Sequence, residues 1–379
     1  MLQYSFSSVY MAVITSNILL ILITILFRNH KMMINTGYKL LALFIALTTL
    51  RFALPFEFSF TTPVFLEESP HLSRIISFLQ HRMTIREGIT VSPWNLFEII
   101  WLVGFVFNLF RYIRMRRRAG YFILANSLDV TREEPYRSAI ERICRERGKK
   151  NSFHLLTVQG LNTFMIYGIF VPHILIPENV ELPEEKWYYI LSHEASHHFH
   201  HDLLIKTLTK FITMIYWWNP ASHILNKQVD VILEMRVDNI VAAYSKETIA
   251  KYLHCLTELG ELATRQNMIP ETVTMSLMTG KDSALVQRYH MLLSVGKKKN
   301  PVISILLFLL FITIHAASHF VIFEAHYVTP EVAETSIRST NVNTHAILKE
   351  DGTYDIYFEG IFIENTDSLE YYPEDIPIN

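Results

Sequence analysis

A histidine–glutamate cluster is the clearest chemical feature of the sequence. Residues 193–197 read His-Glu-Ala-Ser-His, the pattern HExxH. Positions four apart share one face of a helix, so both imidazoles can reach a single zinc ion. Glu194 lies beside the first histidine and can take a proton from a water molecule that zinc activates. The spacing therefore predicts His193 and His197 as zinc ligands and Glu194 as the catalytic base.

A third ligand is expected from a helix further along the chain. Glu234 and Asp238 are four residues apart and share a helix face, although a solvated helix edge would show the same pattern. Glu234 would complete a His₂Glu site whose fourth position stays open, as in catalytic zinc sites. Asp238 would accept a hydrogen bond from a ligand histidine and hold its ring in place. The rival third ligand is His201, but on one straight helix it would lie about 12 Å from His193.

The elements that must position these residues can be read from the flanking sequence. A helix is expected to start near Pro183-Glu184-Glu185, because proline and acidic residues favour the first helical turn. An apolar run at 187–191 precedes the motif, which indicates a buried helix. His198, His200 and His201 are interpreted as residues that face the surface or the lipid headgroups. Upstream, the sequence predicts an amphipathic helix and three short strands, at 131–148, 153–158, 163–170 and 173–176.

Composition indicates that this chemistry belongs to a membrane protein. Half of the residues are hydrophobic and only 18% are charged, where soluble domains usually carry about 25%. Runs of about 20 apolar residues can cross a bilayer as helices. The predicted spans are residues 9–27, 38–56, 93–110 and 301–323. Arg51, within the second run, is expected to extend towards the interface. The net charge of −2 gives no reason to expect nucleic acid.

Basic clusters set the expected orientation. They follow the first and third runs and precede the fourth, so the positive-inside rule places all three in the cytoplasm. Both termini are then outside the cell. The predicted plan has three spans within 1–113, including an extracellular loop at 57–92, and a cytoplasmic domain at 114–300. The fourth span, 301–323, leads to a short β-rich extracellular tail at 324–379. Between the two metal motifs, the apolar segment 203–218 is interpreted as a helix against the membrane or the spans, because a fifth span would separate His193 from Glu234.

These motifs together resemble the BlaR/MecR-type membrane zinc metallopeptidases, which transduce β-lactam resistance signals, and their relatives that have no antibiotic sensor. The resemblance covers the four-span plan and most of 111–300. It rests on Gly168, Pro172, Ile176-Pro177, Ile190-Leu191-Ser192, His193-Glu194, His197, Asp202, Trp218-Asn219-Pro220, Glu234 and Asp238. It implies a mainly α membrane protein with an α+β gluzincin domain. It also implies zinc held by His193, His197 and Glu234, with Glu194 as base.

The chain departs from the sensor-transducers of this family in its tail. Their penicillin-binding domain has an SxxK motif, whereas residues 324–379 contain none and show a possible hairpin at 345–358. β-Lactam acylation is therefore not expected. The resemblance further implies cleavage of the chain itself, within 270–300, and the removal of a transcriptional repressor.

The leading hypothesis is a zinc endopeptidase in signal transduction. It would be anchored in the plasma membrane, with the lipid bilayer and a peptide or protein substrate as partners. Two alternatives stay open: a housekeeping membrane protease for protein quality control, and a non-catalytic receptor or scaffold with a structural metal site. The donor that stabilises the oxyanion is unassigned, with His223 as a guess.

Overall fold

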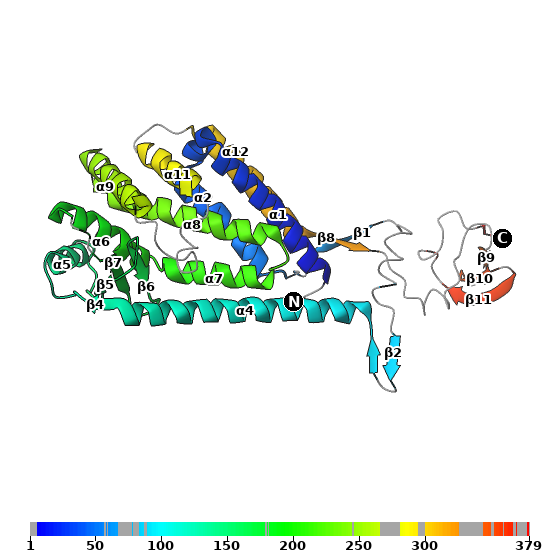
Figure 1. The fold of residues 1–379 in the computed structure, drawn as a ribbon. Coiled ribbons are helices and arrows are strands. Elements are labelled where there is room, and N and C mark those ends of the chain that lie inside the picture. Colours follow the sequence, from blue (N-terminus) through cyan, green and yellow to red (C-terminus); the bar gives the residue numbers. More distant parts are fainter. Residues whose placement is uncertain are drawn as a thin grey trace. The chain divides into compact units, whose positions relative to one another are not determined.

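The computed structural model describes most of the chain, in two compact units (Figure 1). The described residues are 6–56, 58, 60–66, 78, 83–86, 89–178, 180, 182–244, 246–265, 281–294, 300–325, 344–349, 352–358, 360–366, 369 and 377–378. One unit comprises residues 1–64 and 97–323, and the other comprises residues 65–96 and 324–379.

Helices account for most of the larger unit. They are α1 (Phe6–Arg28), α2 (His30–Ala53), α4 (Pro93–Asn126), α5 (Tyr136–Glu146), α6 (Glu184–Phe199), α7 (Asp202–Ile215), α8 (Pro220–Val241), the 3₁₀ turn η1 (Ala242–Tyr244), α9 (Lys246–Arg265), α11 (Lys281–Leu293) and α12 (Pro301–Phe320). The strands are β1 (Thr62–Leu66), β2 (Met83–Arg86), β3 (Ile89–Val91), β4 (Ser127–Asp129), β5 (His154–Val158), β6 (Met165–Tyr167), β7 (His173–Pro177), β8 (Val321–Ala325), β9 (Thr344–Leu348), β10 (Tyr354–Phe358) and β11 (Ile361–Thr366).

Within the described residues, four helices are long and apolar enough to cross a membrane, and they correspond to the four predicted runs: α1, α2, α4 and α12. Their bounds differ from the prediction where the backbone changes conformation. Helix α2 already begins at His30, but Gly37 leaves the helical region (φ 74°), so the uninterrupted part starts where the run was predicted to start. The chain beyond Phe320 is the strand β8, not the end of a helix. Helix α4 continues past the arginine cluster to Asn126, about 51 Å in all, well beyond a bilayer core of about 30 Å.

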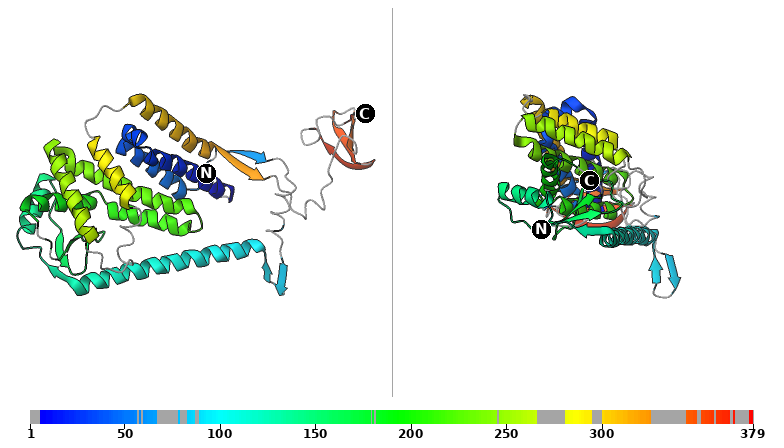
Figure 2. Two further views of the ribbon diagram at one scale, coloured as in Figure 1. Left: turned by 45° about the horizontal axis from the view of Figure 1, so that its top comes forward. Right: turned by 60° about the vertical axis from the view of Figure 1, so that its left-hand side comes forward.

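Helices α1, α2 and α12 pack together, and their shared core joins them to α7, α8 and α11, of which α8 carries Glu234 (Figures 1 and 2). Phe44 of α2 stacks on Phe311 of α12, with ring centroids 4.1 Å apart. The Arg51 side chain is buried inside this bundle, with 2% of its surface exposed. Its guanidinium donates to Ser318 Oγ (3.0 Å) and to the carbonyl oxygens of Ser318 (3.0 Å) and Leu54 (3.3 Å). These acceptors lie at the ends of α12 and α2, so Arg51 joins the two helices there.

A four-stranded sheet precedes the HExxH helix. Its order is β4-β5-β7-β6, with β5 and β7 parallel and the two edge strands antiparallel. The three predicted strands are present, although the middle one is shortened to Met165–Tyr167, and β4 was not predicted. The predicted amphipathic helix is α5, which begins after Pro135 and ends before Gly148 (φ 61°), so it spans only Tyr136–Glu146. Helices α5 and α6 bury their apolar faces with this sheet in one cluster.

Helix α7 lies between α6 and α8 in the chain and packs against α8 and α2. Ile212 and Tyr216 are buried in the core of the span bundle, which is the bundle formed by α1, α2 and α12. This position is expected for a segment that lies against the spans. A tight turn follows, in which the Asn219 side chain accepts from the Ala221 amide (3.1 Å) and Pro220 occupies the first turn of α8. Asn219 thus caps α8, the helix that carries Glu234.

Two tryptophans join α4 to the turn between α7 and α8. The Trp101 indole donates to the Ile215 carbonyl (2.9 Å), and the Trp217 indole donates to the Trp101 carbonyl (3.2 Å). The Trp217 ring lies directly on Gly104, where an added Cβ would be 2.3 Å from the ring. A glycine is therefore required at position 104 for this contact.

The described residues of the smaller unit form two antiparallel β-structures. Strands β2 and β3 form a hairpin. Strands β9, β10 and β11 form a three-stranded sheet with β10 in the centre. The hairpin expected at 345–358 corresponds to β9 and β10; of its turn, Gly352 is described with φ 84°, whereas residues 350 and 351 lie outside the described residues.

The Gly104 contact makes a stability prediction. Replacing Gly104 by alanine should lower the thermal unfolding temperature in detergent, because overpacking typically costs about 1–3 kcal/mol. The matched control is Gly120→Ala on the same helix, where the new Cβ would meet only the Tyr167 hydroxyl, at 3.2 Å. Both changes gain about 1 kcal/mol of helix propensity, so the control should unfold at or above the wild-type temperature. Circular dichroism melting curves compare them; equal midpoints would contradict the packing described here.

Candidate metal centre

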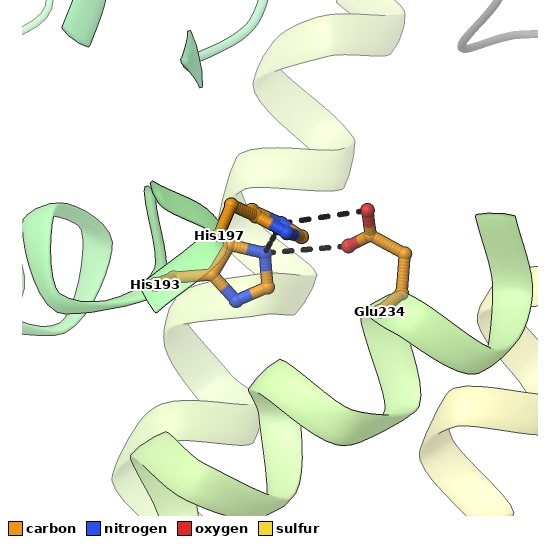
Figure 3. Close-up of side chains that lie close together, drawn as sticks. All are labelled: His193, His197 and Glu234. Atoms are coloured by element: carbon orange, nitrogen blue, oxygen red, sulfur yellow. Dashed lines mark hydrogen bonds and ion pairs between the residues drawn. The ribbon is translucent and has the colours of Figure 1, made fainter. Parts of the chain in front are cut away.

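The metal centre is formed where α6 packs against α8. These helices bring together His193, His197 and Glu234, whose ligand atoms all lie within 4.8 Å of one another (Figure 3). The two Nε2 atoms are 3.3 Å apart. Glu234 Oε2 is 3.3 Å from His193 Nε2, and Glu234 Oε1 is 3.5 Å from His197 Nε2. The structure thus places the three predicted ligands in one cluster.

Helix α6 can present these histidines because its other face is anchored. Trp187, Leu191 and Ala195 recur every four residues and are buried with the sheet and α5. Tyr189, His193 and His197 follow the same spacing on a second face, which turns towards α8 and α9. The predicted start of the helix near Glu184 is confirmed. Burial on two faces fixes the rotation of α6, and with it the direction of both imidazoles.

Asp202 orients the second histidine. Its Oδ2 lies 2.8 Å from His197 Nδ1, and its Oδ1 pairs with Arg236 of α8. An ionised carboxylate only accepts, so His197 donates through Nδ1–H, and Nε2 is the ring atom that can bind a metal. The chain reverses to make this contact at His201, whose φ of 57° lies in the left-handed region. Helix α6 has ended by then, so His201 is exposed and lies outside the ligand cluster.

Tyr252 of α9 contacts the first histidine, where Asp238 was predicted. The Tyr252 hydroxyl is 2.7 Å from His193 Nδ1 and 2.7 Å from Asp238 Oδ1. Asp238 Oδ1 itself is 3.5 Å from His193 Nδ1, too far for the predicted direct hydrogen bond. Arg288 of α11 holds Asp238 with two bonds, at 2.7 and 2.8 Å. Asp238 therefore reaches the histidine through a tyrosine.

The donor set fits a divalent metal ion such as zinc. His197 Nε2 faces the Nε2 atom of His193 and the carboxylate of Glu234. Three acceptor groups at 3.3–3.5 Å from one another repel unless a cation or a proton lies among them. Two imidazoles and one carboxylate are also the ligands that zinc uses in catalytic sites. His193, His197 and Glu234 are therefore the residues that would hold the metal.

Cations around Glu234 keep it ionised. Burial alone would raise its pKa, but His197, Arg288 and Lys206 hold the pKa of Glu234 well below the ordinary carboxyl value. Lys206 of α7 lies 3.5 Å from Glu234 Oε1 and 3.5 Å from Asp230 Oδ1. Burial alone would lower the pKa of Lys206, but the carboxylates of Glu234, Asp230 and Glu194 raise it. Glu234 is thus a carboxylate at neutral pH, which is the form that binds a metal.

Four other residues were singled out in the sequence: Glu194, His198, His200 and His223. Glu194 is buried beside His193, 8% exposed. His198 and His200 are half-buried, not on the surface as expected: His198 packs edge-on against Phe153, and His200 Nδ1 bonds the Ser196 carbonyl (2.8 Å). His223 is exposed on α8, about 16 Å along the axis from Glu234, so it is too far away to donate to an oxyanion at this centre.

Several contacting residues had no assigned role in the sequence analysis. Asp202 was named only as part of the family resemblance. Its position just after the end of the HExxH helix could have indicated a partner for a ligand histidine. Tyr252 and Arg288 have no such signal, because they come from separate helices and belong to no motif. The two cysteines, Cys144 and Cys255, are buried and form no disulfide.

The role of Asp202 can be tested by metal affinity. Asp202→Ala should weaken zinc binding by about 10- to 100-fold, because His197 loses the partner that fixes its ring. Competition with a chromogenic zinc chelator measures this change. His201→Asn is the control: asparagine tolerates the left-handed conformation but removes the rival ligand. Wild-type affinity in His201→Asn is expected, and loss of zinc there instead of in Asp202→Ala would make His201 the ligand.

Comparison with known proteins places the chain in a family. The family model described as BlaR1 peptidase M56 matches residues 8–292. The chain therefore belongs to the BlaR1 peptidase M56 family, and the resemblance found in the sequence is confirmed. The match extends from α1 to α11 and includes every residue of the metal centre.

Individual relatives match over shorter stretches. A "Methicillin resistance mecR1 protein" from Staphylococcus aureus is 26% identical over 159 residues, which is 41% of this chain and 26% of the relative. A protein of the same description from Staphylococcus epidermidis matches equally well. The "Regulatory protein BlaR1" of Bacillus licheniformis is 22% identical over 188 residues, 49% of this chain and 30% of the relative. The chain thus spans about a quarter to a third of the length of these relatives.

Proposed function

We propose that this protein is a zinc-dependent endopeptidase, anchored in the plasma membrane, that acts in signal transduction. One observation carries the proposal: two histidines of an HExxH helix and one glutamate of a second helix converge within 4.8 Å, with Glu194 beside them. Membership of a family of peptidases supports hydrolysis of a peptide bond as the reaction. A structural metal site has no use for a glutamate in the position of Glu194.

Each residue of the centre has its own role in the proposed reaction. His193, His197 and Glu234 would hold the zinc and leave its fourth position open. When bound, zinc supplies a Lewis acid that polarises the scissile carbonyl and lowers the pKa of water to about 7. Glu194 takes the proton of the attacking water and delivers it to the leaving amine. The cationic Lys206 faces the same carboxylates and keeps the buried negative charge balanced.

The proposed topology is that of four spans with both termini outside. The candidate spans α1, α2, α4 and α12 and the positions of the basic clusters support it. The protease domain, 114–300, then faces the cytoplasm, and the tail, 324–379, faces outwards. Helix α8 packs on α1 and α2, so the metal centre would stand close to the inner membrane surface.

The proposed substrate is a peptide or protein in the cytosol or at the membrane. It is either this protein itself, in the segment 270–300, or a regulator such as a transcriptional repressor. Residues 270–280 and 295–299 of that segment lie outside the described residues. Residues 281–293 form α11, and a helix must unwind before a peptidase cleaves it. The relatives are described as a regulatory protein and as methicillin resistance proteins, which supports the signalling interpretation over general protein degradation.

Replacing the catalytic base separates chemistry from metal binding. Purified Glu194→Gln in proteoliposomes should keep wild-type zinc content and lose cleavage of itself and of casein by at least 100-fold, since general base catalysis contributes about 10²–10⁴-fold. Zinc is measured by mass spectrometry and cleavage by gel electrophoresis.

The control for this experiment is Glu184→Gln, which makes the same change at an exposed position of the same helix. It should keep both zinc and cleavage. Glu234→Ala should lose the zinc. If Glu194→Gln cleaves as well as wild type, the endopeptidase proposal is wrong.

A further inference from the structure

Two side chains that belong to no recognised motif complete the surroundings of the metal centre. Tyr252 of α9 is 1% exposed, and Arg288 of α11 is largely buried. They form one chain of contacts that runs from Arg288 through Asp238 and Tyr252 to His193. The helices that carry them lie after the helices of the predicted ligands in the sequence.

Donors and acceptors along this chain can be assigned one by one. Asp238 is fully buried and is paired with Arg288 through both oxygens, so it is an ionised acceptor. The Tyr252 hydroxyl must therefore donate its single proton to Asp238. Its oxygen can then only accept at the other contact, where the donor is His193 Nδ1–H. With Nδ1 committed to the Tyr252 hydroxyl, Nε2 is the ring atom of His193 that can bind a metal, and Nε2 is the atom that faces Glu234.

We propose that Tyr252 and Arg288 are positioning residues of the metal centre. Tyr252 fixes the ring orientation and the tautomer of His193. Arg288 fixes the direction of the Asp238 carboxylate on which Tyr252 depends, and its Nη1 also lies 3.4 Å from Glu234 Oε2. The inference rests on the proposed metal site but not on any particular substrate.

The two histidines are therefore held in different ways. His197 is held directly by Asp202, five residues further along the chain. His193 is held through a tyrosine from one helix, an aspartate from a second and an arginine from a third. The geometry at His193 thus depends on the docking of α9 and α11 against α6 and α8.

Arg288 is placed by the packing of α11 as well as by its ion pairs. On the same helix, the Gln287 side chain donates to the Phe27 carbonyl at the end of α1 (3.2 Å). The His290 ring packs against His30 at the start of α2, with centroids 4.4 Å apart. Met291 is buried in the core of the span bundle. Helix α11 is thus fixed to α1 and α2 on one side while it offers Arg288 to Asp238 on the other.

Tyr252→Phe tests the first link, because it removes one oxygen and keeps the ring. The purified full-length protein in detergent is titrated with Zn²⁺ against a chromogenic chelator. Affinity should fall by about 10- to 100-fold, the usual effect of removing a partner of a metal-ligating histidine. Tyr189→Phe is the matched control: Tyr189 is buried in the same cluster, next to the Tyr252 ring, and it should bind zinc within twofold of wild type.

A spectroscopic readout separates positioning from general destabilisation. Co²⁺ in place of zinc should give a shifted visible absorption band in Tyr252→Phe but not in Tyr189→Phe, because only the former changes the surroundings of a ligand. Wild-type zinc affinity and an unchanged cobalt band in Tyr252→Phe would overturn the proposal for Tyr252.

The link through Arg288 needs a variant that does not strand a buried charge. Arg288→Ala alone leaves Asp238 unpaired and can prevent folding. The double variant Asp238→Asn/Arg288→Gln removes both charges together. The amide introduced at position 238 could donate to the Tyr252 hydroxyl as well as accept from it. The hydrogen bond from His193 to Tyr252 would then no longer have a fixed direction, and zinc affinity should fall at least tenfold. Unchanged affinity in a folded double variant would overturn the role of Arg288.

The outcomes distinguish this inference from the proposed function. If wild type binds zinc and Tyr252→Phe binds it equally well, the positioning role alone fails. If Tyr252→Phe binds zinc weakly but wild type cleaves nothing, the positioning role stands and the endopeptidase proposal fails. A wild-type protein that binds no zinc contradicts both.

Discussion

The double burial of α8 is the constraint on which the rest of the structure depends. Ile232, Leu233 and Met235 are buried in the core shared with α1, α2 and α12, while Glu234 and Asp238 turn towards α6 and α9. A helix that is packed on opposite sides can neither rotate nor slide without opening one of its contacts. The position of the Glu234 carboxylate is therefore set by the packing of α8 on α1, α2 and α12 as much as by the domain that contains the histidines.

Charge balance is the second constraint, and it explains why the centre is surrounded by cations. The carboxylates of Asp202, Glu234 and Asp238 all lie close to His193 or His197. A buried charge without a partner of opposite sign is costly. Arg236 pairs with Asp202, Arg288 with Asp238, and Lys206 with Asp230 and Glu234. With these pairs in place, the negative charge at the ligands can be matched to a divalent cation. The surroundings are thus suited to hold a metal without a large excess of charge of either sign.

Local periodicity explains which features were predictable. His193 and His197 follow from spacing on one helix, and Glu234 follows from the need for a third ligand with the right chemistry. The apolar runs identified the four candidate spans, but their ends were less certain because Gly37, the strand β8 and the continuous helix through the arginines are set by backbone conformation and packing. Tyr252 and Arg288 were not predictable, since their contacts join helices that are far apart in sequence. The same holds for Arg51, whose acceptors at the end of α12 are invisible in its own segment.

The order of the elements along the chain has a consequence for biosynthesis. His193, His197 and Glu234 are synthesised well before Tyr252 and Arg288, and α11 is the last element to contribute to the centre. A nascent chain that has reached Val241 holds the three residues that would bind the metal but lacks Tyr252 and Arg288. The contacts of the centre can be completed only after Arg288 has been synthesised. Full assembly of the site therefore depends on α9 and α11 as well as on the helices that carry His193, His197 and Glu234.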